Sequence, residues 1–76
     1  MNKQRRKDLS RIESQLEDLR DDLESLRDEE EEYYENIPEN MAESDRAYAA
    51  QEAVDKLNDA VDYLNDAIIY VEEAQA

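Results

Sequence analysis

The sequence predicts an all-α protein, an antiparallel helical hairpin that packs as a coiled coil, on three observations. The first is a seven-residue repeat, in which AVDKLND, AVDYLND and AIIYVEE follow one another from Ala53. The second is a heptad spacing of apolar residues in the first half of the chain as well. The third is the single Pro38 between the halves of a chain without glycine. A period of seven residues is typical of helices that supercoil around each other.

The repeat defines the faces of a helix that we predict over residues 44–75. Val54, Val61 and Ile68 occupy heptad position a, and apolar residues three further on occupy position d. From Ala53 onward, position g holds only alanine and position c holds two tyrosines, so the apolar face is wider than one two-helix seam requires. Alanine favours helices in any context, but four in register favour close helix approach. The residues expected to contact a second copy of the chain are Ala53, Ala60, Tyr63, Ala67, Ile69, Tyr70 and Ala74.

A second helix, predicted over residues 3–35, carries a narrower apolar stripe. Steps of three and four separate its apolar residues, which alternate between positions a and d, while charged and polar residues such as Arg20 and Arg27 border the stripe at e and g. We therefore expect this first helix to contact one partner, whereas the second contacts several. The stripe consists of Leu9, Ile12, Leu16, Leu19, Leu23, Leu26, Tyr33 and Ile37, with Glu30 as the interruption.

The two helices are separated by a turn, predicted at residues 36–43. Pro38 lacks a backbone donor and disfavours a helical conformation for the residue before it, so the first helix should end near Glu35. Asn40 and Ser44 are competing caps for the second helix. We favour Ser44, with a short helical turn between Pro38 and Ala42.

Folding the chain back at this turn predicts which residues lie opposite each other. In an antiparallel pair the numbers of opposite residues sum to a constant, and the value that fits the turn is 80. The predicted pairs are Leu26 with Val54, Leu23 with Leu57, Leu19 with Val61, Leu16 with Leu64, Ile12 with Ile68, Leu9 with Val71, Tyr33 with Ala47, Glu30 with Ala50, and Lys7 with Glu73.

Charge restricts the possible partners. The net charge is −14, from 23 acidic and 9 basic residues; residues 1–11 hold five bases and one acid, and the rest of the chain four bases and 22 acids. Such a chain repels nucleic acid and anionic membranes and attracts basic protein surfaces. No apolar run is long enough to span a bilayer, and the basic start lacks the apolar core of a signal peptide. We expect a cytoplasmic protein.

Catalytic and metal-binding patterns are missing from the sequence. Without Cys or His, the thiol nucleophile and the usual general base are absent, and a zinc site would need carboxylates alone. The acidic run at residues 28–32 lacks the glycine and spacing of a calcium loop. Carboxylate pairs that act as acid and base need a concave pocket, which we do not expect between two helices. The prediction is a protein that is not an enzyme and uses no cofactor.

Two features are candidate sites for a protein partner. The acidic run crowds the end of the first helix, where the macrodipole disfavours anions, although a solvated face would look the same. Tyrosines near the turn form an apolar tip, which could anchor a partner or only close the end of the bundle. The candidate residues are Asp21, Asp28, Glu31, Glu32, Tyr33, Tyr34, Ile37 and Met41.

The turn YYENIPENMAESDRA, with its PEN segment followed by a Ser-acid pair, resembles that of small uncharacterised acidic helical-hairpin proteins of Gram-positive bacteria and their phages. The resemblance covers the whole chain and implies the hairpin fold but no activity. Secreted WXG-type hairpins have a similar size, but this turn lacks Trp and Gly. Their C-terminal Tyr-x-x-x-acid signal also fails, because Tyr70 is followed four residues later by Ala74.

Since 76 residues are few for one self-sufficient core, we expect oligomerisation. The function predicted from the sequence is an acidic adaptor or scaffold, acting as a homodimer that forms a four-helix bundle with the second helix of each chain inside. The alternative is a nucleic-acid mimic of phage or mobile-element origin, which would inhibit a DNA- or RNA-binding protein through its carboxylates.

Overall fold

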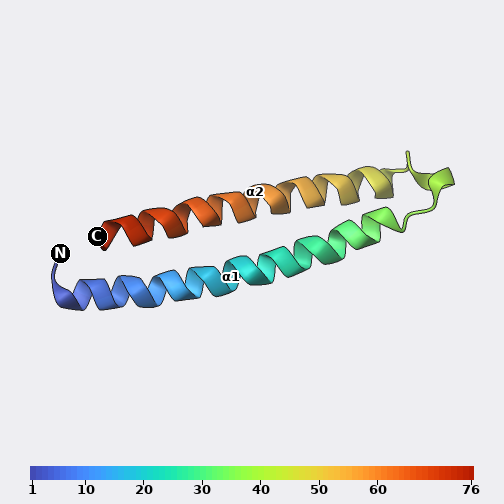
Figure 1. Ribbon diagram of the computed structural model, residues 1–76. Helices are drawn as coiled ribbons and strands as arrows, with labels where there is room; N and C mark the ends of the chain where they lie inside the picture. Colours follow the sequence, from blue (N-terminus) through green and yellow to red (C-terminus); the bar gives the residue numbers. More distant parts are fainter.

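The computed structural model describes residues 1–76 and consists of two long helices that run side by side in opposite directions (Figure 1). Helix α1 spans Lys3–Glu35, helix α2 spans Asp45–Ala74, and a short 3-10 turn, η1, spans Glu39–Met41 between them. Both termini lie at one end of the hairpin and the turn lies at the other. The Cα trace measures 60 × 14 × 13 Å. The predicted helical hairpin is confirmed, and the helix bounds agree with the prediction to within one residue.

Side chains cap the start of both helices. The side chain of Ser44 accepts a hydrogen bond from the backbone N–H of Ala47 over 3.3 Å, so Ser44 caps α2 in preference to Asn40. Asn2 does the same for α1, accepting from the N–H of Arg5 over 2.7 Å, a cap that we did not predict. Such a cap stabilises a helix by about 1 kcal/mol.

The core of the hairpin is small and belongs to α2. Only Ala47, Ala50, Val61 and Ile68 are buried, and α1 has no buried residue. Three of the four occupy position a and Ala50 occupies position d, so the a row of α2 faces α1. Small alanines near the turn let α1 approach closely.

Helix α1 is rotated relative to the predicted seam. Its a residues Leu9, Leu16 and Leu23 are half-buried, as expected. Its d residues were predicted to be in the same seam, and this prediction is wrong, because each is between 37% and 55% exposed. The exposed d residues are Ile12, Leu19, Leu26 and Tyr33.

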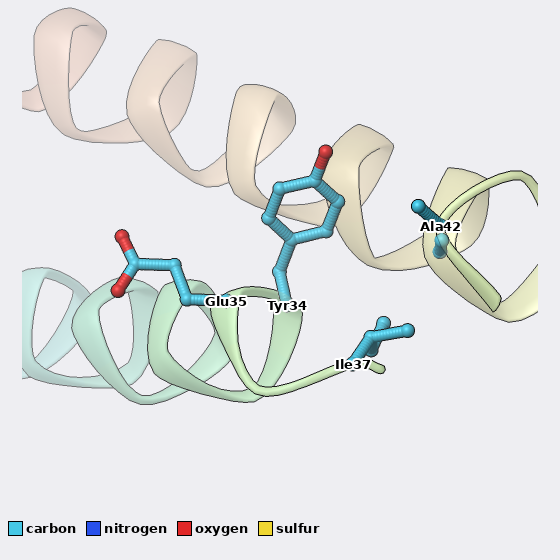
Figure 2. A pocket seen from close by; sticks show the side chains of 5 residues that line it. Tyr34, Glu35, Ile37 and Ala42 are labelled. Carbon is cyan, nitrogen blue, oxygen red and sulfur yellow. The ribbon is translucent and has the colours of Figure 1, made fainter. Parts of the chain in front are cut away.

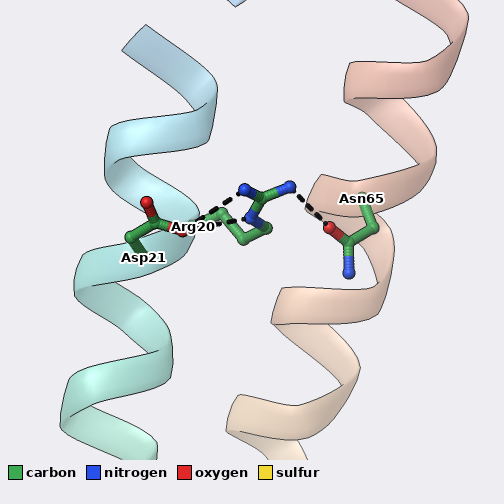
Figure 3. Close-up of polar contacts among 3 residues, drawn as sticks. All are labelled: Arg20, Asp21 and Asn65. Carbon is green, nitrogen blue, oxygen red and sulfur yellow. Dashed lines mark hydrogen bonds and ion pairs between the residues drawn. The ribbon is translucent and has the colours of Figure 1, made fainter. Parts of the chain in front are cut away.

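Position e of α1 takes the place of position d. Arg20 and Arg27 are partly covered, with side-chain exposures of 27% and 25%. The Nη1 of Arg20 donates to Oδ1 of Asn65 on α2 over 3.1 Å (Figure 3). The aliphatic stems of arginines cover apolar surface while their charged ends stay polar, which explains why α1 turns this side towards α2. The helices therefore meet through a and e of α1.

One predicted pair differs in the structure. Because α1 is rotated, Tyr34 rather than Tyr33 lines a pocket together with Ala47. The predicted neighbours Lys7 and Glu73 form no ion pair; the two ion pairs of the chain connect adjacent residues of α1. These are Arg20 with Asp21 at 3.3 Å and Arg27 with Asp28 at 3.1 Å.

Candidate interaction surface

The hairpin has one polar side and one apolar side. Two hydrogen bonds cross between the helices, Arg20 to Asn65 and Gln75 to Glu13, and both use position e of α1. Positions d and e flank position a on opposite sides of a helix. The d row of α1 therefore lies on the other side of the hairpin, next to the d and g rows of α2. No hydrogen bond between the helices uses these rows.

We call this second side the open face. It consists of the d row of α1 (Ile12, Leu19, Leu26 and Tyr33) and the g row of α2 (Ala53, Ala60, Ala67 and Ala74).

The open face is apolar from Ile12 to Tyr33 on α1 and from Ala53 to Ala74 on α2. Between its two rows lie the half-buried d residues of α2, Leu57, Leu64 and Val71. A surface depression on α1, lined by Gln15, Asp18 and Leu19, adjoins the d row. Soluble monomers seldom expose a continuous apolar strip of this kind, and such strips mark surfaces that bind another molecule.

The predicted contact residues of α2 fall into three groups. The four alanines lie on the open face. Tyr63 and Tyr70 lie at its outer edge and are 74% and 70% exposed. Ile69, at position b, lies away from the open face, near the side that carries Asn65. It shares position b with Tyr48, which is also exposed.

Sequence reasoning missed the contribution of α1 to this surface. The residues Ile12, Leu19, Leu26 and Tyr33 were assigned to the core, because an a/d stripe is the same in sequence whether its d row faces the hairpin partner or a further helix. The only available signal was the pair of arginines at position e, whose stems are long enough to cover a seam.

The residues of the tip have different roles. Tyr34, Glu35, Ile37, Ala42 and Ala47 line a pocket of about 170 Å³, and the Tyr34 ring projects from α1 towards α2 (Figure 2). Tyr34 and Ile37 are half-buried here, so they close the end of the hairpin. The other two tip candidates are exposed: Tyr33 belongs to the open face, and Met41 lies in η1.

The acidic candidates all lie at the surface. Asp21, Asp28, Glu31 and Glu32 are exposed, and the first two are paired with the arginines before them. No group of three or more acidic side chains is placed to hold one metal ion. Every buried side-chain polar atom has a hydrogen-bond partner. Neither helix has the length and apolar character that crossing a bilayer requires.

Comparison of the chain with protein-family models, curated proteins and solved structures found no match. The resemblance to Gram-positive and phage hairpins stays a prediction.

Proposed function

We propose that this hairpin is a non-enzymatic protein–protein interaction module, an adaptor or scaffold that acts as a homodimer in a four-helix bundle. The observation that supports this is the rotation of α1. In a four-helix bundle each helix contacts two neighbours, so its a and d rows point between them and its two edges each meet one neighbour. An isolated two-helix pair would instead bury a and d in one seam.

Both helices have the orientation that a second neighbour requires. Helix α1 contacts α2 through a and e and leaves its d row exposed, while α2 turns its a row towards α1 and has a g row that is half-buried except for Ala74. The d row of α1 and the g row of α2 lie on the same side of the hairpin. A second hairpin laid on this side would complete the bundle, with both helices of each copy at the interface rather than α2 alone.

The open face has the size of a small dimer interface. Its rows run over 21 residues of each helix, about 32 Å at 1.5 Å per residue. With the 14 Å width of the hairpin they cover roughly 450 Å², below the about 800 Å² that a standard interface buries per partner. Complete burial of a leucine contributes about 1.5–3 kcal/mol, and Leu19 and Leu26 are more than half exposed in the single hairpin. Dimerisation would thus add apolar burial that a core of four residues lacks.

The oligomeric state tests this proposal. Sedimentation equilibrium or light scattering at micromolar concentration should give twice the 9.0 kDa chain mass. Leu19→Asp should yield monomers, because it places a carboxylate in a dry contact. Ile69→Asp is the matched control, since Ile69 is 50% exposed and Leu19 is 55% exposed. A monomeric wild type, or a monomer produced by Ile69→Asp alone, contradicts the proposal.

In such a dimer the acidic outer faces would stay available to a partner with a basic surface. We propose a cytoplasmic location for this module.

A second candidate function is the nucleic-acid mimic of phage or mobile-element origin. It is favoured by the 60 Å length of the hairpin and by the exposure of all four acidic candidates. Binding through many ion pairs weakens steeply with salt. Replacing Asp21, Asp28, Glu31 and Glu32 by their amides should then abolish binding to a captured nucleic-acid-binding protein. Binding that survives both high salt and these replacements excludes the mimic.

A further inference from the structure

We infer that the two hairpins of the proposed dimer pack antiparallel, with their tips at opposite ends, so that α1 lies on α1 and α2 on α2 of the second copy. This inference rests on the proposed dimer and adds the orientation, which the charges of the chain decide.

The charged residues at both ends of α1 have the opposite sign to those that its macrodipole favours. Residues 3–11 hold five bases and one acid, and residues 28–35 hold six acids and no base. Its first turn contains no acid and its last turn no base. A helix is stabilised by anions near its N-terminus and cations near its C-terminus. Both ends of α1 therefore lack the charges that would stabilise them.

Helix α2 supplies one base, Arg46, at the tip. Residues 28–46 contain nine acids and this one base, because the turn and the start of α2 add three more carboxylates. At the other end of the hairpin, the net charge of residues 1–11 is +4, and residues 66–76 add only three acids. None of the bases at positions 3–11 forms an ion pair. The hairpin is thus strongly acidic at its tip and slightly basic at its termini.

Two arrangements with twofold symmetry can bring the open faces together. If the hairpins are parallel, each α1 lies on α2 of the second copy, and the two acidic tips lie side by side. If they are antiparallel, each acidic tip lies beside the basic start of the other chain. Because like charges at an interface select against an arrangement, the antiparallel dimer is favoured.

The heptad spacing fits this arrangement. The d row of α1 is evenly spaced, so reversing it opposes Ile12 to Tyr33 and Leu19 to Leu26 of the second copy. The g row of α2 opposes alanine to alanine, which permits close approach. The parallel dimer, in which the d row of α1 would lie on the g-row alanines of α2, is equally compatible with packing. The charges therefore determine the orientation.

One ion pair between the copies follows from the same symmetry. Arg11 and Glu32 both occupy position c of α1, at the edge of the open face, and both are exposed. In the antiparallel dimer Arg11 of each copy lies near Glu32 of the other. In the parallel dimer these residues are at opposite ends, 21 positions apart along α1, or about 30 Å at 1.5 Å per residue.

Distances between spin labels test the orientation. The chain has no cysteine, so Asn40→Cys places one label at each tip. Electron–electron double resonance on the dimer should give a distance close to the 60 Å length of the hairpin. Parallel hairpins would give roughly 20–30 Å, from neighbouring helices about 10 Å apart and the label arms. Ser25→Cys, near the middle of α1, is the control, because its labels should be much closer than the 60 Å length of the hairpin in either arrangement.

A charge exchange tests the ion pair. Arg11→Glu and Glu32→Arg should each weaken the homodimer a few-fold, because each homodimer then contains two like-charge pairs. Mixing the two variants restores both opposite-charge pairs, and native mass spectrometry should show a heterodimer in roughly three- to tenfold excess over the statistical amount.

The outcomes separate the two proposals. A dimer with long tip distances and an excess of heterodimer supports the antiparallel orientation. A dimer with short tip distances, or a statistical mixture of the charge variants, overturns the orientation and leaves the homodimer standing. A wild-type chain that stays monomeric overturns both.

Discussion

The guanidinium of Arg20 on α1 donates a hydrogen bond to the side-chain oxygen of Asn65 on α2, over 3.1 Å, while its other nitrogens contact Asp21. This bond lies on the side of the hairpin opposite the exposed d row of α1.

Asn65→Ala should destabilise the hairpin despite the better helix propensity of alanine. It removes the acceptor of a hydrogen bond from a charged donor at a part-buried site, and we expect a loss of about 1 kcal/mol in the free energy of unfolding. Asn58→Ala is the control, because Asn58 is also half-buried at position e but makes no side-chain hydrogen bond. Urea denaturation measures both. Equal effects would mean that the Arg20 bond contributes nothing.

Two adjacent isoleucines should respond differently to truncation. Ile68 is 6% exposed and Ile69 is 50% exposed. Ile68→Ala should cost about 2–3 kcal/mol through lost burial and an unfilled cavity, whereas Ile69→Ala should cost well under half of that. Thermal or chemical denaturation at one fixed protein concentration tests the difference. A larger loss of unfolding free energy for Ile69→Ala than for Ile68→Ala would contradict the burial of Ile68 in the core.

Truncation of the two tyrosines of the tip should also have different effects. Tyr34→Ala empties the contact beside Ala47 and should lower the free energy of unfolding by about 3 kcal/mol or less, since Tyr34 is only half-buried. Tyr33→Ala should instead weaken dimerisation, because Tyr33 lies on the open face and is 46% exposed. Denaturation and the dimer dissociation constant, measured on both variants, distinguish these effects. If Tyr33→Ala leaves dissociation unchanged, the open face ends before this residue.

Moderate salt should raise the melting temperature. The net charge is −14, like-charged neighbours such as Asp28 with Glu32 and Glu31 with Glu35 repel each other, and only two short-range ion pairs offset this. Salt at 0.1 M screens charges beyond about 10 Å. Calorimetric scans between low salt and 0.2 M measure the effect. A falling melting temperature would show that attraction between the basic and acidic ends outweighs the repulsion.

The sequence allowed a correct prediction of features that depend on local chemistry. Ser44 caps α2 because a hydroxyl precedes a free backbone N–H, and α1 ends before Pro38 because proline cannot continue it. The wider apolar face of α2 was predictable from its four alanines, which recur every seven residues.

The rotation of α1 could not be predicted in this way. Rows d and e lie on either side of row a, and the sequence places leucines in one and arginines in the other. Which of them faces α2 depends on how the Arg20 and Arg27 stems compete with Leu19 and Leu26 for the same surface. That competition involves both helices at once, so the two arginines of α1 indicate the rotation without determining it.

A core of four residues, all on α2, also bears on how long the folded chain persists. In the proposed dimer the second copy adds apolar burial to this small core, so association is coupled to folding, and the folded fraction falls on dilution. Proteases cleave the unfolded fraction, which means that the half-life of the chain should lengthen as its amount rises. Such a protein is stable only where it is abundant, and its removal accelerates as its synthesis stops.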